Sequence, residues 1–254
     1  MVLGPSTVEN LFALGLGDRV AGVSDYCGAP GAEGIARLGG QLNPNLESLA
    51  ALQPDLVLTQ GTLPELEGFC RRQGFPLLSL ATDTWAGWQA EIGRLGTLFG
   101  VEERAGRLVD KARKEMAALA ADRDPSRPPT PALLVVGRRA GEAGGLVVAG
   151  RASFLSELLA FAGGRNVFAD NRRDYFDLAE EALVRAAPEV IFELRPGSSE
   201  TKAQVLHAWQ AGFPALPAVR FGRVVLLTQD FILLPGPRMP AIAALLAEGL
   251  ASRH

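Results

Sequence analysis

The stretch Leu11-Phe-Ala-Leu-Gly-Leu-Gly-Asp-Arg-Val20 contains, in order, the apolar end of a helix, a glycine cap and the beginning of a strand. Later in the chain, Leu158-Leu-Ala-Phe-Ala-Gly-Gly-Arg-Asn-Val167 has the same order at the same length. The agreement indicates that one structural unit occurs twice in this chain.

A second pair of segments follows in the same order. Glu47 stands seven residues before Pro54-Asp-Leu-Val57, and Glu181 stands seven residues before Pro188-Glu-Val-Ile191. Each segment is typical of a short helix that begins with an acidic residue, a turn that contains proline, and a buried strand. One such match could arise because helix-loop-strand units resemble one another. Two matches in the same order predict two similar α/β lobes.

Short apolar runs alternate with helical stretches along the chain, which predicts an α/β fold with central, mainly parallel sheets. Several runs are continuously apolar, as expected where helices cover both faces of a sheet. A very short first strand is expected at Val2-Leu3-Gly4. The other expected strands are Val20–Ser24, Asp55–Thr59, Leu77–Leu80, Ala132–Gly137, Val190–Glu193 and Arg223–Thr228.

Residues 86–122 have the pattern of one or two long amphipathic helices. Apolar residues between Ala105 and Ala120 recur at i, i+3 and i+4 spacing, and charged residues fill the other positions. The following segment, Asp124–Pro131, contains four prolines and cannot continue a helix. The expected organisation is an N-terminal α/β lobe at 1–86, a long interdomain helix at 87–123 and a C-terminal α/β lobe at 124–254.

Composition argues against several classes of function. The net charge of −3 provides no basic field for a nucleic acid, so no nucleic-acid partner is expected. The chain has only His207, His254, Cys27 and Cys70 as histidines and cysteines, too few to cluster around zinc or copper. The two cysteines could form one disulfide or none. We expect no metal site and no catalytic residue, and no apolar stretch is long enough to span a membrane.

Seven parts of the sequence together resemble a known family. They are Pro5–Val20, Gly22–Cys27 with Pro30, Gly39–Glu47, Leu52–Val57, Ala162–Phe168, Glu181 with Pro188, and Pro235–Arg238. In these segments the chain is similar to the substrate-binding proteins of ABC importers for cobalamin, siderophores and haem, and most of all to the cobalamin-binding branch. Each motif alone is weak, but the similarity extends in order over essentially the whole chain.

The resemblance implies a binding protein and not an enzyme. Two lobes joined by a rigid interdomain helix would hold a corrinoid in the cleft between them, without a cofactor, and deliver it to an ABC transporter permease dimer. Haem or a ferric siderophore is the alternative ligand. The resemblance further implies a monomer, in the periplasm or lipid-anchored at the outer face of the cytoplasmic membrane, with a signal segment that this chain does not include.

The resemblance also assigns roles to residues. Glu47 and Glu181 match the two glutamates that dock on arginines of the permease. Alternatively, both are simply acidic residues in the first turn of a helix. The residues expected to contact the ligand are Tyr26, Trp85, Arg138, Tyr175, Asp230 and Phe231. The chain departs from the cobalamin binders at Gln41, where they have tryptophan, and at Leu234, where they have arginine.

The segment Gly137-Arg-Arg-Ala-Gly-Glu-Ala-Gly-Gly145 leaves a second function open. A glycine-rich loop after a strand can hold phosphate, but this segment fits neither G-x-x-x-x-G-K-[ST] nor G-x-G-x-x-G. We expect a loop that turns Arg138 or Arg139 toward the ligand. The alternative is a cytoplasmic two-lobed enzyme that acts on a phosphorylated substrate.

Overall fold

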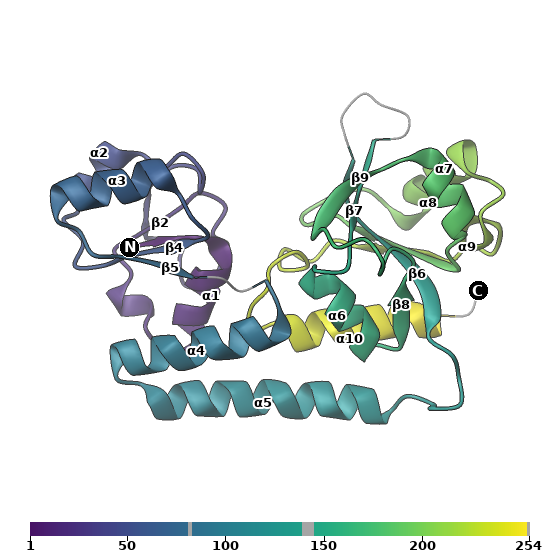
Figure 1. The fold of residues 1–254 in the computed structure, drawn as a ribbon, viewed down its shortest axis with the longest axis horizontal. Coiled ribbons are helices and arrows are strands. Elements are labelled where there is room, and N and C mark those ends of the chain that lie inside the picture. Colours follow the sequence, from purple (N-terminus) through teal and green to yellow (C-terminus); the bar gives the residue numbers. More distant parts are fainter. Residues whose placement is uncertain (81–82, 139–144, 253–254) are drawn as a thin grey trace. The chain divides into compact units, whose positions relative to one another are not determined.

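The computed structural model describes residues 1–80, 83–138 and 145–252. The chain forms two compact units, of which the first is Met1–Ala112 with Leu234–Pro237 and the second is Arg113–Leu233 with Arg238–His254. Each unit is built around its own sheet (Figure 1). The predicted α/β fold with mainly parallel sheets is confirmed.

The first lobe has a five-stranded sheet in the order β3-β2-β1-β4-β5, with every neighbouring pair parallel. Its strands are β1 (Val2–Leu3), β2 (Gly22–Val23), β3 (Ala36–Arg37), β4 (Val57–Gln60) and β5 (Leu77–Leu80). Its helices are α1 (Pro5–Ala13), α2 (Leu46–Ala51), α3 (Pro64–Gln73) and α4 (Trp85–Phe99), and Gly17–Arg19 form a 3₁₀ turn. Leu3, Leu49, Val57 and Leu66 belong to one buried cluster, so α2 and α3 pack on one face of this sheet.

The second lobe has a six-stranded sheet in the order β11-β10-β6-β7-β9, with β8 beside β6. Its strands are β6 (Thr130–Arg138), β7 (Leu146–Ala149), β8 (Gly164–Asn166), β9 (Tyr175–Leu178), β10 (Val190–Leu194) and β11 (Val224–Leu227). Its helices are α6 (Phe154–Phe161), α7 (Glu180–Ala186), α8 (Lys202–Gly212), α9 (Pro217–Arg220) and α10 (Met239–Ala251). Among the described strands of this sheet, β7 pairs antiparallel with both β6 and β9, and the other pairs are parallel.

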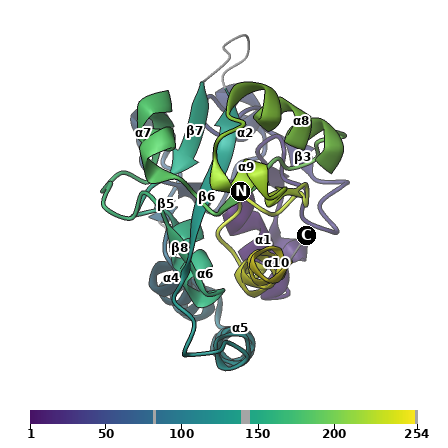
Figure 2. The same cartoon turned by 90° about the vertical axis from the view of Figure 1, so that its right-hand side faces the viewer.

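Helices cover both faces of the second sheet, which explains its apolar strands. Helix α10 packs beside α6, as Figures 1 and 2 both show. Gly249 of α10 lies against the ring of Phe192, on one face of β10. The next residue, Glu193, points to the opposite face and accepts a hydrogen bond from Trp209 of α8. The two faces of β10 are therefore covered by different helices.

The two lobes share a common topology. The parallel order β2-β1-β4-β5 in the first lobe corresponds to β8-β6-β10-β11 in the second. A detail of the backbone also recurs: Gln53 and Ala187, each directly before a proline, have positive φ values of 43° and 42°. The internal repeat seen in the sequence is thus a structural duplication.

The long amphipathic segment forms two helices, α4 and α5 (Glu102–Ala121). Gly100, with φ of 67°, ends α4 in a left-handed cap, and Gly96 lies against Ala105 of α5. The boundary between the two units falls within α5, after Ala112. Among the described helices, none is both long and apolar enough to cross a membrane.

Several strands differ from the expected bounds. Leu77–Leu80 agrees at both ends, whereas the segment expected at Val20–Ser24 forms a strand only at Gly22–Val23. Strands β3, β7 and β9 were not expected. Gly137 and Arg138 belong to β6, so the expected glycine-rich loop begins later, and its residues 139–144, including Arg139, lie outside the described part of the chain.

Candidate functional site

The carboxyl ends of the parallel strands are the first place to look for a ligand site. In open α/β sheets, ligands bind outside these ends, where the strand order reverses direction. In the first lobe the reversal lies between β1 and β4. Gly4 follows β1 with φ of 152°, and a Cβ atom at this position would lie 3.0 Å from the Cβ of Gln60. Glycine therefore allows the two strand ends to approach closely.

Tyr26 lies in the loop after β2 and is the most exposed of the large hydrophobic residues that the structure describes, with 93% of its surface accessible. Its φ of 62° is in the left-handed region, which is unusual for a residue with a side chain. Arg37 fixes this loop by donating hydrogen bonds to the carbonyl oxygens of Ser24 (3.3 Å) and Cys27 (3.1 Å). Sequence reasoning missed Arg37, because the carbonyl oxygens of Ser24 and Cys27 are thirteen and ten positions away from it.

Trp85 begins α4, also in the first lobe. Thr84 caps this helix by accepting a hydrogen bond from the Gly87 amide at 2.9 Å. The Trp85 ring is half-buried and stacks on Trp88, with 5.3 Å between the ring centroids. Trp88 is fully buried and donates its indole N–H to Asn10 of α1 at 2.9 Å. One face of the Trp85 ring is thus held by a fixed neighbour.

Arg138 ends β6 in the second lobe, and its guanidinium is held on two sides. Its Nη2 donates to Oε1 of the buried Glu193 on β10, and its Cζ lies 5.0 Å from the centroid of the Trp209 ring. Arg195, just after β10, donates from Nε to the other oxygen of Glu193 at 3.1 Å. Sequence reasoning predicted Arg138 but missed Glu193, which stands within an apolar strand.

Asp230 and Phe231 lie in the loop after β11 and share a partner, Arg238. The Arg238 guanidinium donates to Asp230 Oδ1 at 3.2 Å and lies 4.2 Å from the centre of the Phe231 ring. Tyr175 lies elsewhere in this lobe: it begins β9 opposite Ala149, and its hydroxyl accepts a hydrogen bond from Ser153 at 3.2 Å. The structure therefore brings Asp230 and Phe231 together and places Tyr175 in a different part of the sheet.

The two glutamates identified by the repeat occupy equivalent elements. Glu47 lies in the first turn of α2, and Glu181 lies in the first turn of α7; both side chains are exposed. A surface pocket of about 400 Å³ is lined by residues of the segments 42–46 and 63–66, and Glu47 is not among them. Glu181 itself lines an open pocket of about 530 Å³ with Val184 and Phe213.

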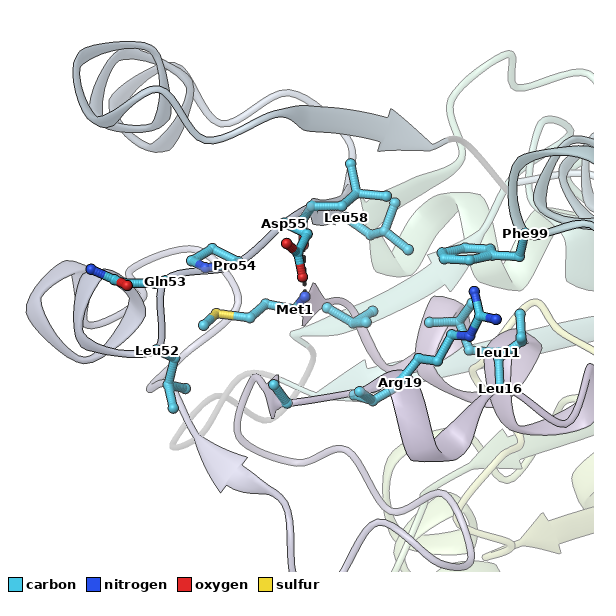
Figure 3. A pocket seen from close by; sticks show the side chains of 14 residues that line it. Met1, Leu11, Leu16, Arg19, Leu52, Gln53, Pro54, Asp55, Leu58 and Phe99 are labelled. Carbon is cyan, nitrogen blue, oxygen red and sulfur yellow. Dashed lines mark hydrogen bonds between the residues drawn. The ribbon is translucent and has the colours of Figure 1, made fainter.

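Another pocket, of about 370 Å³, lies in the first lobe at the amino ends of β1 and β4 (Figure 3). Leu11 and Leu16 form part of its wall, and the Arg19 guanidinium lies 6.0 Å from the centroid of the Phe99 ring. Its size suits a small molecule. It lies at the amino ends of the strands, however, whereas Tyr26 follows the carboxyl end of β2, so we do not assign the ligand to this pocket.

The two cysteines lie in the first lobe, in the loop after β2 and in α3. Cys27 and Cys70 are both buried free thiols. Burial raises the pKa of each thiol. Within the described part of the chain, no group of three or more His, Cys, Asp or Glu side chains is placed to hold a metal ion.

Known proteins similar to this chain are periplasmic binding proteins. The vitamin B12-binding protein of Vibrio parahaemolyticus is 29% identical over 240 residues, which are 93% of this chain and 83% of that protein. The structure of a periplasmic haem-binding protein from Pseudomonas aeruginosa is 27% identical, with a TM-score of 0.82 over 100% of this chain and 92% of that chain. The structure of the periplasmic vitamin B12-binding protein of Vibrio cholerae is 24% identical, with a TM-score of 0.79 over 98% and 94% of the two chains. The profile of the periplasmic binding protein family matches residues 1–231, so the chain belongs to this family.

Proposed function

We propose that this protein is the substrate-binding component of an ABC importer, which captures a corrinoid and delivers it to a permease dimer. The observation that carries this proposal is the similarity to vitamin B12-binding proteins, at 29% identity over 93% of the chain. We place the protein in the periplasm, where it is free or anchored by lipid. It acts as a monomer, without a cofactor.

The ligand contacts that we propose come from both lobes. The first lobe offers Tyr26, on a loop fixed by Arg37, and Trp85. The second lobe offers Arg138, Tyr175, and the pair Asp230 and Phe231. Exposed aromatic rings suit a flat macrocycle, because each ring gives a large contact area and loses little conformational freedom on binding.

Haem in the same role is the second candidate. It is supported by solved haem-binding structures that are 27–28% identical to this chain, close to the identity of the vitamin B12-binding relatives. Absorbance titrations with cyanocobalamin, haemin and ferrichrome test these ligands, because each chromophore reports its own capture. Stoichiometric binding of a corrinoid at micromolar affinity or tighter is expected. If none of the three binds, the proposed function is wrong.

We further propose that Glu47 and Glu181 dock on basic side chains of the permease. Exposed carboxylates at equivalent positions on two similar lobes can pair with arginines on two copies of a partner and set its orientation. Replacing both with glutamine should weaken binding to the permease and leave ligand affinity unchanged. The matched control replaces Glu189 and Glu248, exposed glutamates on other elements. If ligand affinity falls in the first variant, these carboxylates belong to the ligand site and the docking role is wrong.

A further inference from the structure

The second lobe contains a buried carboxylate in an apolar setting. Glu193 is 1% exposed and lies in the middle strand of the run β11-β10-β6, on the face that α8 covers. The core on this face includes Leu133, Val135, Ile191 and Val205. A buried carboxylate costs several kcal/mol unless its partners compensate it, whereas an apolar side chain would incur no such cost. What Glu193 contributes must therefore be found in the residues that it binds.

Glu193 uses both of its oxygens to hold two arginines. Its Oε1 accepts hydrogen bonds from Trp209 Nε1 at 2.7 Å and from Arg138 Nη2. Its Oε2 accepts a hydrogen bond from Arg195 Nε at 3.1 Å. Because Arg138 ends β6 and Arg195 directly follows β10, the two guanidiniums lie at the carboxyl ends of adjacent parallel strands. Open α/β folds bind their ligands at the carboxyl ends of the strands.

Both guanidiniums remain partly accessible. The Arg138 side chain is 32% exposed and the Arg195 side chain is 19% exposed. The Nη1 atom of Arg195 donates to Glu200, whose side chain is 45% exposed and also accepts a hydrogen bond from the Ser198 hydroxyl at 3.3 Å. Glu200 lies on a surface segment before α8, so its carboxylate can leave Arg195 without disturbing the core. Glu193, in contrast, is fixed by the strand.

We propose that Glu193 is a positioning residue, which holds Arg138 and Arg195 as a paired donor site for one anionic group of the ligand, and that Glu200 occupies this site until the ligand binds. This inference rests on the proposed function. When Glu200 leaves, two guanidiniums and one carboxylate retain one positive charge. The group that fits is therefore a carboxylate or a phosphodiester with a single negative charge, which guanidinium N–H groups bind in a defined geometry.

Binding of three macrocycles can show whether the anionic group is a phosphodiester or a carboxylate. Cyanocobalamin carries one phosphodiester, haemin carries carboxylates, and dicyanocobinamide carries neither. In Glu200→Gln the competing charge is gone, and an exposed ion pair of this kind corresponds to a change in affinity of up to about 5-fold. We expect tighter binding of the anion-bearing macrocycle that the unmodified protein binds, and unchanged binding of dicyanocobinamide. Glu189→Gln, at the other end of β10, is the matched control and should change neither affinity.

Two further variants distinguish positioning from a structural role. Arg195→Lys keeps the charge but loses the fork of N–H donors, and Glu193→Gln loosens both guanidiniums. Each should weaken binding of the anion-bearing ligand about tenfold while the affinity for dicyanocobinamide is retained. A purely structural role would lower all affinities together. Far-ultraviolet circular dichroism first establishes that each variant is folded, and Arg195→Lys carries the test if Glu193→Gln does not fold.

A measurement without a macrocycle completes the test. Inorganic phosphate should raise the melting temperature of Glu200→Gln more than that of the unmodified protein, and Arg195→Lys in the same background should remove the difference. If macrocycles bind but Glu200→Gln changes no affinity, or all affinities equally, the inference is wrong. If no macrocycle binds but phosphate stabilises Glu200→Gln, the donor site stands and the proposed function is wrong. If neither effect occurs, both are wrong.

Discussion

Gly150 follows β7 at a point where the backbone of residues 171–174 passes close to it. Its amide donates to the carbonyl oxygen of Asp174 at 2.8 Å, and the next amide, of Arg151, donates to the carbonyl oxygen of Asn171 at 2.8 Å. A Cβ atom on Gly150 would lie 2.1 Å from the carbonyl oxygen of Arg173. Because that oxygen belongs to the backbone, it cannot rotate away as the end of a flexible side chain could. We therefore predict that Gly150→Ala strongly destabilises this lobe.

The loss of stability in Gly150→Ala can be estimated from the contact between the added Cβ atom and the Arg173 carbonyl oxygen. Real Cβ atoms essentially never approach another heavy atom within 3.0 Å, so the Arg173 carbonyl must retreat by about 0.9 Å. The displaced segment leads directly into Tyr175, which pairs with Ala149 at the end of β7. Overpacking costs about 1–3 kcal/mol, and a clash with backbone belongs at the upper end. For a chain of this length, about 3 kcal/mol lowers the melting temperature by roughly 6–12 °C.

Gly137→Ala is the matched control, since it makes the same substitution in the neighbouring strand β6. A Cβ atom there would lie 3.7 Å from Val147, which is an ordinary contact. Thermal unfolding followed by circular dichroism at 222 nm compares the two variants. The control should melt within about 2 °C of the unmodified protein. If Gly150→Ala also melts within that interval, the segment yields more easily than its geometry indicates and the reasoning fails.

Three further predictions concern other parts of the chain. Arg37→Ala removes hydrogen bonds from the loop 24–32, worth about 2 kcal/mol together, so the loop amides should exchange with deuterium about 30-fold faster; unchanged exchange would contradict the ordering role. Burial raises the pKa of the Cys27 and Cys70 thiols, so neither should react quickly with a disulfide reagent at pH 7.5 until the protein is unfolded. The hydrogen bond from its arginine partner holds the pKa of Glu200 below 4.5, so that contact is complete above pH 4.5 and is lost as the pH falls through the lowered value. An NMR titration of this carboxyl should show a midpoint that returns toward 4.5 when the arginine is replaced by glutamine.

The strands predicted from sequence were those with continuous apolar runs. Leu77–Leu80 agrees at both ends, and the runs at 132–137, 190–193 and 223–228 agree within two residues. The central runs at 132–135 and 190–194 are fully buried, as expected for strands covered on both faces, whereas Leu77–Leu80 is partly buried. The break between α4 and α5 could not be read from periodicity, because it depends on the left-handed conformation of Gly100.

Two of the strands that sequence reasoning missed, β3 and β9, have exposed residues and no continuous apolar run. In β9 the residues at Tyr175 and Asp177 are exposed, and β3 has two exposed residues. Strand β7 is different, because its sequence Leu-Val-Val-Ala is apolar and mostly buried, and only its antiparallel direction depends on its partners β6 and β9. For β3 and β9 the local composition gives a weak signal, because pairing with distant segments forms these strands.

The missed site residues have the same explanation. Glu193 is the one polar residue of the apolar run Val190–Leu194, and its partner Arg138 is 55 positions away. Arg37 appears as an ordinary surface arginine, although its guanidinium is bound to carbonyl oxygens of the loop that carries Tyr26. The sequence shows that both residues are charged, but the partners that each one binds lie close to it only in the folded chain.

The backbone before the two prolines explains why the repeated glutamates are comparable in structure as well as in spacing. A positive φ in a residue with a side chain costs about 1–2 kcal/mol, yet Gln53 and Ala187 both adopt it, at 43° and 42°. This conformation sets the direction in which α2 leads into β4 and α7 leads into β10. Because the same unfavourable turn is retained in both lobes, Glu47 and Glu181 are held at equivalent places relative to their own sheets. Equivalent placement is what docking on two copies of one partner requires, whereas an acidic residue that only stabilised its helix would need no such match.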